Sequence, residues 1–85
     1  MLLYSFTVKS KANSESAICL VWVNQSEPDD AESLARETVD RSGWVVVSLD
    51  DVSQTTKDDY FAPCPSLDAF NLASREGSAS RVVAL

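Results

Sequence analysis

Residues 17–24 of the 85-residue chain read Ala-Ile-Cys-Leu-Val-Trp-Val-Asn, and seven of these eight residues are apolar. In an extended segment its apolar side chains fall on both faces, Ile18, Leu20 and Trp22 on one and Cys19, Val21 and Val23 on the other. A strand that is apolar on both faces is typical of the centre of a sheet. The sequence therefore predicts a sheet built around residues 17–24.

The segment before this strand alternates between apolar and polar side chains. Residues 2–9 place Leu2, Tyr4, Phe6 and Val8 on one face and Leu3, Ser5, Thr7 and Lys9 on the other. This period of two is typical of a strand with one buried face. Residues 11–16 are mostly polar and contain Asn13, a frequent turn residue. We therefore expect residues 2–24 to form an antiparallel hairpin.

Residues 27–42 predict a helix. Ser26 can cap its start, and Pro28 lies in the first turn, where a missing N–H costs nothing. Its apolar stripe has the spacing of a helix that lies on a sheet, with Ala31, Leu34, Ala35, Thr38 and Val39. Gly43 then supplies the stop.

Residues 44–49 predict a third strand, rich in valine and apolar on both faces, so we expect it to be internal as well. Residues 53–65 are irregular and long for a connection in so small a domain. Two interpretations remain open: the third strand continues beyond Val52 as a twisted arm, or the segment is a binding loop.

Residues 66–76 predict a second helix, with Ser66 as its cap and Gly77 as its terminator. Residues 78–85 form either a fourth strand at a sheet edge or, if the helix runs through Gly77, its last turn. The valine pair in this tail favours the strand.

The order is then β-β-α-β-α-β, within a single domain spanning residues 1–85. The predicted fold class is α+β: a two-layer sandwich with an antiparallel sheet of three to four strands and two helices on one face. This arrangement is loosely similar to the ferredoxin-like folds.

Composition excludes several classes of function. The chain has 13 acidic and 7 basic residues, a net charge of −6 and no histidine. Catalytic sites that require histidine are excluded, and the scattered basic residues argue against binding to nucleic acid. No apolar run is long enough to cross a membrane, and the N-terminus does not resemble a signal peptide. We therefore expect a cytoplasmic protein without a cofactor.

Polar candidate sites have simple structural interpretations. Cys19 and Cys64 could form one bridge, but two reduced thiols are favoured. Cys64 precedes the second helix, where a thiol can become reactive, although a turn residue is the favoured interpretation. Three Asp-Asp pairs could bind a hard cation. The favoured interpretation is that one pair stabilises the start of a helix and that the other two are solvent-exposed in a turn and a loop, so no metal site is predicted.

The large apolar residues point to an interface. Tyr60 and Phe61 either anchor the long loop on the core or form the centre of a contact patch. Two helices cover one face of the sheet, so the other face should expose a large apolar area. The candidate interface residues are Trp22, Trp44, Leu20, Val46, Tyr60 and Phe61.

This pattern predicts a small acidic, non-enzymatic protein-interaction module, which forms a homodimer through the open sheet face or binds a protein partner. A regulatory domain that binds a small molecule is the alternative. A thiol-based enzyme or redox sensor that uses Cys64 is a third, less favoured hypothesis.

Overall fold

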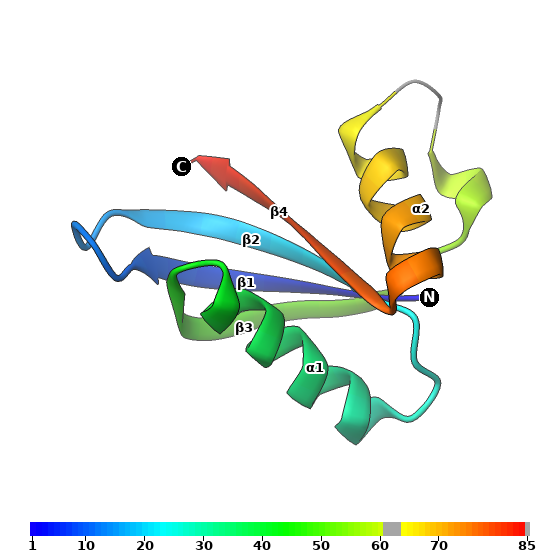
Figure 1. Cartoon of the computed structure of the whole chain (residues 1–85), viewed down its shortest axis with the longest axis horizontal. Helices are drawn as coiled ribbons and strands as arrows, with labels where there is room; N and C mark the ends of the chain where they lie inside the picture. Colours follow the sequence, from blue (N-terminus) through cyan, green and yellow to red (C-terminus); the bar gives the residue numbers. More distant parts are fainter. Residues whose placement is uncertain (61–63, 85) are drawn as a thin grey trace.

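Four strands form one antiparallel sheet in the computed structural model, which describes residues 1–60 and 64–84, apart from the side chains of Lys57 and Ala84. In chain order the elements are β1 (Leu2–Ser10), β2 (Ser16–Val23), α1 (Pro28–Arg41), β3 (Trp44–Gln54), the short 3₁₀ turn η1 (Lys57–Asp59), α2 (Pro65–Glu76) and β4 (Ser78–Ala84). The strands lie in the order β3-β1-β2-β4 (Figure 1). The predicted α+β class, the order of elements and the antiparallel sheet are confirmed, and the loose likeness to ferredoxin-like folds is consistent with them. The tail after Gly77 is a strand.

The predicted hairpin forms the centre of the sheet. β1 and β2 pair from Leu2↔Val23 to Lys9↔Ser16. The Ser10 N–H donates to the Glu15 carbonyl at 2.8 Å and closes the loop. Both neighbours of the hairpin are edge strands, β3 beside β1 and β4 beside β2.

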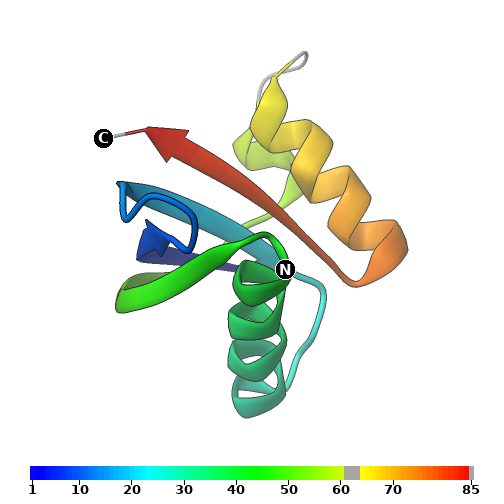
Figure 2. The same cartoon turned by 60° about the vertical axis from the view of Figure 1, so that its left-hand side comes forward.

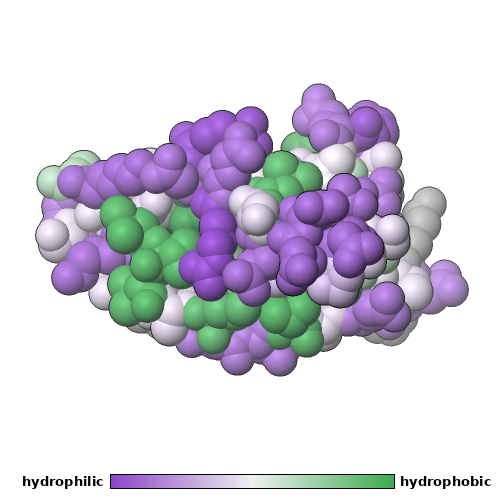
Figure 3. All heavy atoms as spheres, turned by 90° about the horizontal axis from the view of Figure 1, so that it is seen from below, coloured by the Kyte–Doolittle hydropathy of each residue, from purple (hydrophilic) through white to green (hydrophobic). Residues whose placement is uncertain are grey.

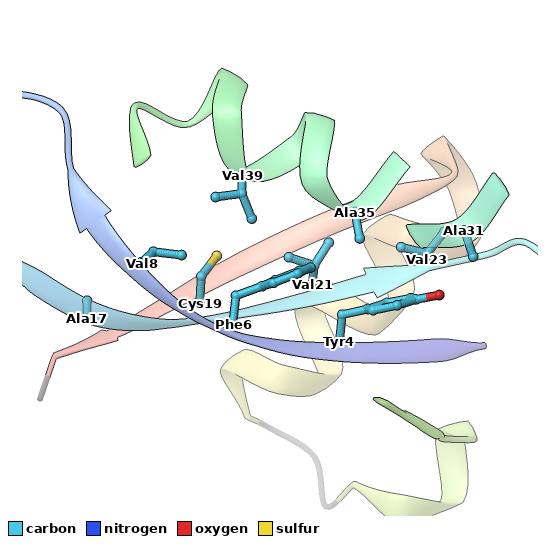
Figure 4. Packing of buried hydrophobic residues seen from close by; sticks show 10 residues of the cluster. All are labelled: Tyr4, Phe6, Val8, Ala17, Cys19, Val21, Val23, Ala31, Ala35 and Val39. Atoms are coloured by element: carbon cyan, nitrogen blue, oxygen red, sulfur yellow. The ribbon is translucent and has the colours of Figure 1, made fainter. Parts of the chain in front are cut away.

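One face of the sheet, here called the α1 face, packs against α1. Its core contains ten buried side chains, Tyr4, Phe6, Val8, Ala17, Cys19, Val21, Val23, Ala31, Ala35 and Val39 (Figure 4). Leu34, Trp44 and Val46 are partly buried against this cluster. The predicted helical stripe therefore faces the sheet as expected.

The opposite face, here called the α2 face, packs against α2 at one end. Trp22, Ala69, Ala73 and Ala79 form its buried cluster, with Leu3, Leu20, Tyr60 and Phe70 partly buried around them. The prediction that both helices lie on one face is therefore corrected. Because β3 and β4 lie at opposite edges, the connection between them passes across the sheet, and it places α2 over the apolar residues that α1 leaves uncovered.

The third strand is an edge strand and not an internal one, which corrects a second expectation. Its apolar pattern reflects an alternation between valines that face α1 and valines in solvent: Val46 is half-buried, whereas Val45 and Val47 are 49 % and 59 % exposed. β3 continues past Val52 and pairs with β1 as far as Leu2↔Gln54, so the predicted arm is present for two residues. From Thr55 the chain leaves the sheet and forms the short turn η1.

The helix starts differ from the predicted caps. Glu27 occupies the N-cap of α1 and forms no side-chain cap bond, so Ser26 is not the cap. At α2 the helix begins one residue early, and Cys64 Sγ, not Ser66, accepts a hydrogen bond from the Leu67 N–H at 3.2 Å. Pro at N1 fixes the backbone in both places. Gly77 ends α2 with φ 98°, as predicted.

Candidate functional site

The predicted interface residues do not form one surface. Trp22 is 1 % exposed and lies beneath α2, and Leu20 is partly buried beside it. Trp44 and Val46 pack on the other side of the sheet, against the α1 cluster. Phe61 lies outside the described residues. An uncovered sheet face centred on these side chains is therefore absent from the part of the chain that the structure describes.

Tyr60 anchors the segment after β3 to the core, as one of the two predicted interpretations proposed. The Trp22 Nε1–H donates to Tyr60 Oη at 2.8 Å, and the hydroxyls of Tyr60 and Thr55 are hydrogen-bonded at 2.9 Å. The Tyr60 ring also lies 5.8 Å from that of Phe70, centroid to centroid. These contacts satisfy the buried indole N–H and hold the connection over Trp22.

A carboxylate extends this chain of hydrogen bonds to the surface. Asp59 Oδ2 accepts from the Thr56 N–H and from Thr55 Oγ1, each at 2.8 Å. The backbone N–H of Thr56, followed by the Thr55 hydroxyl, lowers the pKa of Asp59 below its ordinary value. The acidic group therefore has a structural role at the end of the segment.

The other polar candidates are also engaged locally. Cys19 is fully buried, and Cys64 caps α2. Asp50 accepts hydrogen bonds from the hydroxyls of Thr7 at 2.6 Å and Ser48 at 2.8 Å, and these bonds lower its pKa. Among residues 1–60 and 64–84 no cluster of three metal-ligating side chains occurs. No helix of the described chain is long and apolar enough to cross a membrane.

The two edge strands differ in how well they are protected against pairing with another chain. The register of β3 shifts twice along β1, between Ser5/Phe6 and between Thr7/Val8, and the strand carries Asp50 and Asp51. Bulges and charged residues are the usual protection of an edge. Figure 3 looks at the side of α1 and β3, where hydrophobic side chains are interspersed with hydrophilic ones.

β4 has no bulge and one charged residue fewer than β3. It pairs with β2 in one uninterrupted register from Ser78 to Ala84, and Arg81 is its one charged residue. Val82 and Val83 are 39 % and 37 % exposed. An edge without a bulge, with a single charge and two exposed valines, is the kind of strand that pairs with an added strand.

The outward-facing backbone groups of β4 follow from its pairing. The Asn24 N–H donates to the Gly77 carbonyl at 2.8 Å, which identifies a hydrogen-bonded pair. Such pairs alternate along an antiparallel ladder, so Ala79, Arg81 and Val83 point their backbone groups at β2. Ser78, Ser80 and Val82 point theirs away from the sheet. No other strand of the described residues pairs with this edge.

A groove of about 300 Å³ runs between α2 and β4. Ala69 and Leu72 of α2 and Ala79 of β4 give it an apolar floor, and Asp68 and Arg81 give it one charge of each sign. A wider hollow of about 760 Å³, on the polar outer side of α2, shares Asp68 and Leu72 with the groove. An extended segment at the β4 edge would therefore have both a backbone ladder and a place for side chains.

Sequence reasoning identified β4 as an edge strand but did not consider it as a site. The available signal was the pair Val82-Val83 in a strand with a single charge. The chain matches no protein-family model, and neither the curated proteins nor the solved structures contain a match to it. The function proposed below rests on the geometry of the β4 edge.

Proposed function

We propose that the protein is a small, non-enzymatic interaction module that binds an extended segment of a protein at the open edge of β4. The observation that carries this proposal is the uninterrupted β4 ladder, whose Ser78, Ser80 and Val82 direct their N–H and C=O groups away from the sheet. Main-chain hydrogen bonds from such an edge supply affinity, and adjacent pockets supply specificity.

The groove beside the edge supports the same function. Alternate side chains of an added strand point to the same face, and on the α2 face they lie toward Ala69 and Leu72. Leu72 is 37 % exposed, and a bound side chain would bury it further. The groove has one acidic residue, Asp68, and one basic residue, Arg81. They favour a bound segment that carries a basic group, an acidic group or other polar groups beside its apolar residues.

A cytoplasmic location belongs to the same proposal. Both cysteines are free thiols, and Cys64 uses its Sγ to cap α2. Oxidation of that thiol would replace the group that caps α2 beside the proposed groove with a bulkier one, so a reducing compartment suits the protein.

A proline substitution on the outer side of β4 tests the proposal. Ser80→Pro removes an outward N–H but leaves the β2–β4 ladder intact, because proline is tolerated where its nitrogen faces away from the sheet. Ser80→Ala is the matched control, since it removes the hydroxyl and keeps the N–H. Displayed random dodecapeptides should be selected by the wild-type chain and by Ser80→Ala.

We expect the selected peptides to bind Ser80→Pro at least about tenfold more weakly than the wild type. The substitution removes one main-chain hydrogen bond to the peptide and weakens the hydrogen bonds beside it. In isotope-labelled protein, their amide shifts should centre on Ser78, Ser80 and Val82. Peptides that bind the proline variant unchanged, or that shift only residues of β3, would overturn the proposal. Selection of small molecules but not peptides at the α2–β4 groove would favour the regulatory-domain alternative.

A further inference from the structure

The sequence of β4 is complementary to itself in an antiparallel pairing. A strand that pairs through its outer edge must oppose outward-facing residues to outward-facing residues, so the pairing centres on a residue and not between two. Within Ser78–Ala84, five or more residues pair when the centre is Ser80, Arg81 or Val82. A centre at Arg81 places two guanidinium groups directly opposite each other, which is unfavourable. A centre at Ser80 leaves Val83 beyond the end of the paired residues.

A centre at Val82 pairs outward-facing residues with each other, keeps the two guanidinium groups apart and includes Val83 among the paired residues. Val82 then opposes Val82 of a second copy on the α1 face, and Arg81 opposes Val83 on the α2 face. Ser80 pairs with Ala84 of the other copy at both ends of the ladder. Val82 and Val83 are both exposed in the single chain. This register would cover them together, with the methylenes of Arg81 over Val83 of the other copy.

We propose that the occupant of the β4 edge is a second copy of this chain, paired in the register centred on Val82. The inference rests on the proposed function, since it names the protein segment that binds at the same β4 edge. Two sheets of four strands then form one sheet of eight across a twofold axis. Figure 2 shows β4 at the edge of the sheet, with its C-terminal end pointing away from both helices.

Charge and size set the strength of this dimer. Each chain carries a net charge of −6, so the two copies repel at long range, although Arg81 is the one charge in the pairing strand. At physiological ionic strength, salt screens the repulsion between charges that lie more than about 8–10 Å apart. Association should therefore strengthen as ionic strength rises. Five paired residues on each side form a small interface, so we expect dissociation in the micromolar range.

Mass measurements across concentration test whether the second copy binds. Sedimentation of the full chain from about 1 to 500 μM should show the mass of one chain rising to that of two. Val82→Lys, which places two ammonium groups at the twofold axis, should weaken the dimer at least about tenfold. Val47→Lys on the β3 edge is the control, and it should dimerise as the wild type does.

Cysteine pairs test the register. In a Cys64→Ser background, Val82→Cys places two thiols in a directly opposed pair, with Cα atoms about 5.5 Å apart, which a disulfide can bridge. Glutathione disulfide should oxidise this variant to a covalent dimer. Ser80→Cys should remain uncrosslinked, because its two copies lie four residues apart along the ladder. Retained secondary structure by circular dichroism shows that each variant is folded.

The outcomes separate this inference from the proposed function. Crosslinking at Ser80→Cys, or at neither position, would overturn the Val82 register. Loss of the dimer in Val47→Lys would assign the contact to β3. A chain that stays monomeric at all concentrations but binds displayed peptides at β4 would overturn the second copy as partner and leave the interaction module in place. Absence of both activities would overturn the two proposals together.

Discussion

On the α1 face, Tyr4, Phe6 and Val8 pack directly against the helix, with their rings and branches fully buried along the length of the hairpin. Among the described residues of the α2 face, one large ring, that of Trp22, is buried, and its Nε1–H donates to the hydroxyl of Tyr60. The first contact is mainly apolar, with one hydrogen bond from the Tyr4 hydroxyl to the Pro28 carbonyl of α1, whereas the second depends on a chain of polar groups.

This difference places the larger buried core on one side of the sheet and the groove of the proposed site on the other. α1 contacts the sheet through Ala31, Ala35 and Val39, so its face should unfold together with the whole domain. α2 covers one end of the other face with small residues, Ala69 and Ala73. The α2 face, which has the smaller buried cluster, is the one that carries the groove beside β4.

The two thiols report the opening of the two faces separately. Cys19 is 0 % exposed in the α1-face core, and burial raises its pKa to about 11. Cys64 is half-buried at the start of α2. At pH 8 we expect a disulfide reagent to modify Cys64 first and Cys19 at least about a thousandfold more slowly, because Cys19 reacts only on near-global unfolding.

Site-resolved mass spectrometry of the labelled chain measures both rates. Cys64→Ser is the control and should retain only the slow reaction. Equal rates at the two cysteines would show that the α1 face opens as readily as the α2 face.

Removal of one aromatic ring from each face compares their cores. Phe6 is fully buried, and the Arg36 guanidinium lies 5.7 Å from its ring centroid. Phe6→Ala should lower the free energy of unfolding by about 3–5 kcal/mol. Phe70→Ala on the α2 face should cost about half as much, because Phe70 is only partly buried. Urea denaturation measures both, and a larger loss for Phe70→Ala would reverse the assignment of the faces.

Each face also has one tyrosine hydroxyl, and removal of either leaves its ring in place. Tyr60→Phe deprives the buried Trp22 Nε1–H of its acceptor, so we expect a loss of about 1–3 kcal/mol. The Tyr4 hydroxyl donates to the Pro28 carbonyl at 3.3 Å, a longer bond in a partly exposed place, so Tyr4→Phe should cost about 0.5–1 kcal/mol. Thermal melts of the two variants give the order, and equal losses would show that Trp22 finds another acceptor.

Local sequence patterns were sufficient for the elements but not for their distribution over the sheet. The alternation in residues 2–9, the helical stripe before Gly43 and the terminator Gly77 each predicted an observed element. The sequence did not show which helix packs on which face. Strands that are apolar on both sides indicate that both faces of the sheet must be covered, but they do not indicate which helix covers each face. Strand order is a long-range property: β3 pairs with β1 and lies at an edge, although its valines suggested an internal strand.

The candidate site shows the same limit. Trp22 and Tyr60 are large apolar residues that were predicted to lie at an interface, but they contact each other beneath α2. The helix cap at Cys64 was not predicted, because thiols rarely accept such bonds and Ser66 offered a more usual cap. The β4 edge became a candidate only once its pairing showed which backbone groups face outward.

The smallest expected effect is a dependence of the α2 face on acid. The Thr56 N–H and the Thr55 hydroxyl lower the pKa of Asp59 in the folded chain. A lowered carboxyl pKa contributes stability that is present above the unfolded value, near pH 4, and is lost as pH falls through the folded value. Because Asp59 is exposed at the surface, the change should be small.

Trp22 emission can detect this local change. In a Trp44→Phe background Trp22 is the one tryptophan, and its indole is linked to Asp59 through Tyr60 and Thr55. We expect its emission to shift below about pH 4, before circular dichroism shows loss of the sheet. Asp59→Asn should remove this shift, because the amide does not titrate. Asp50→Asn is the matched control: its carboxylate is also hydrogen-bonded, but to Thr7 and Ser48, so the Trp22 shift should persist. A Trp22 titration unaffected by Asp59→Asn would mean that the polar chain beneath α2 does not depend on this carboxylate.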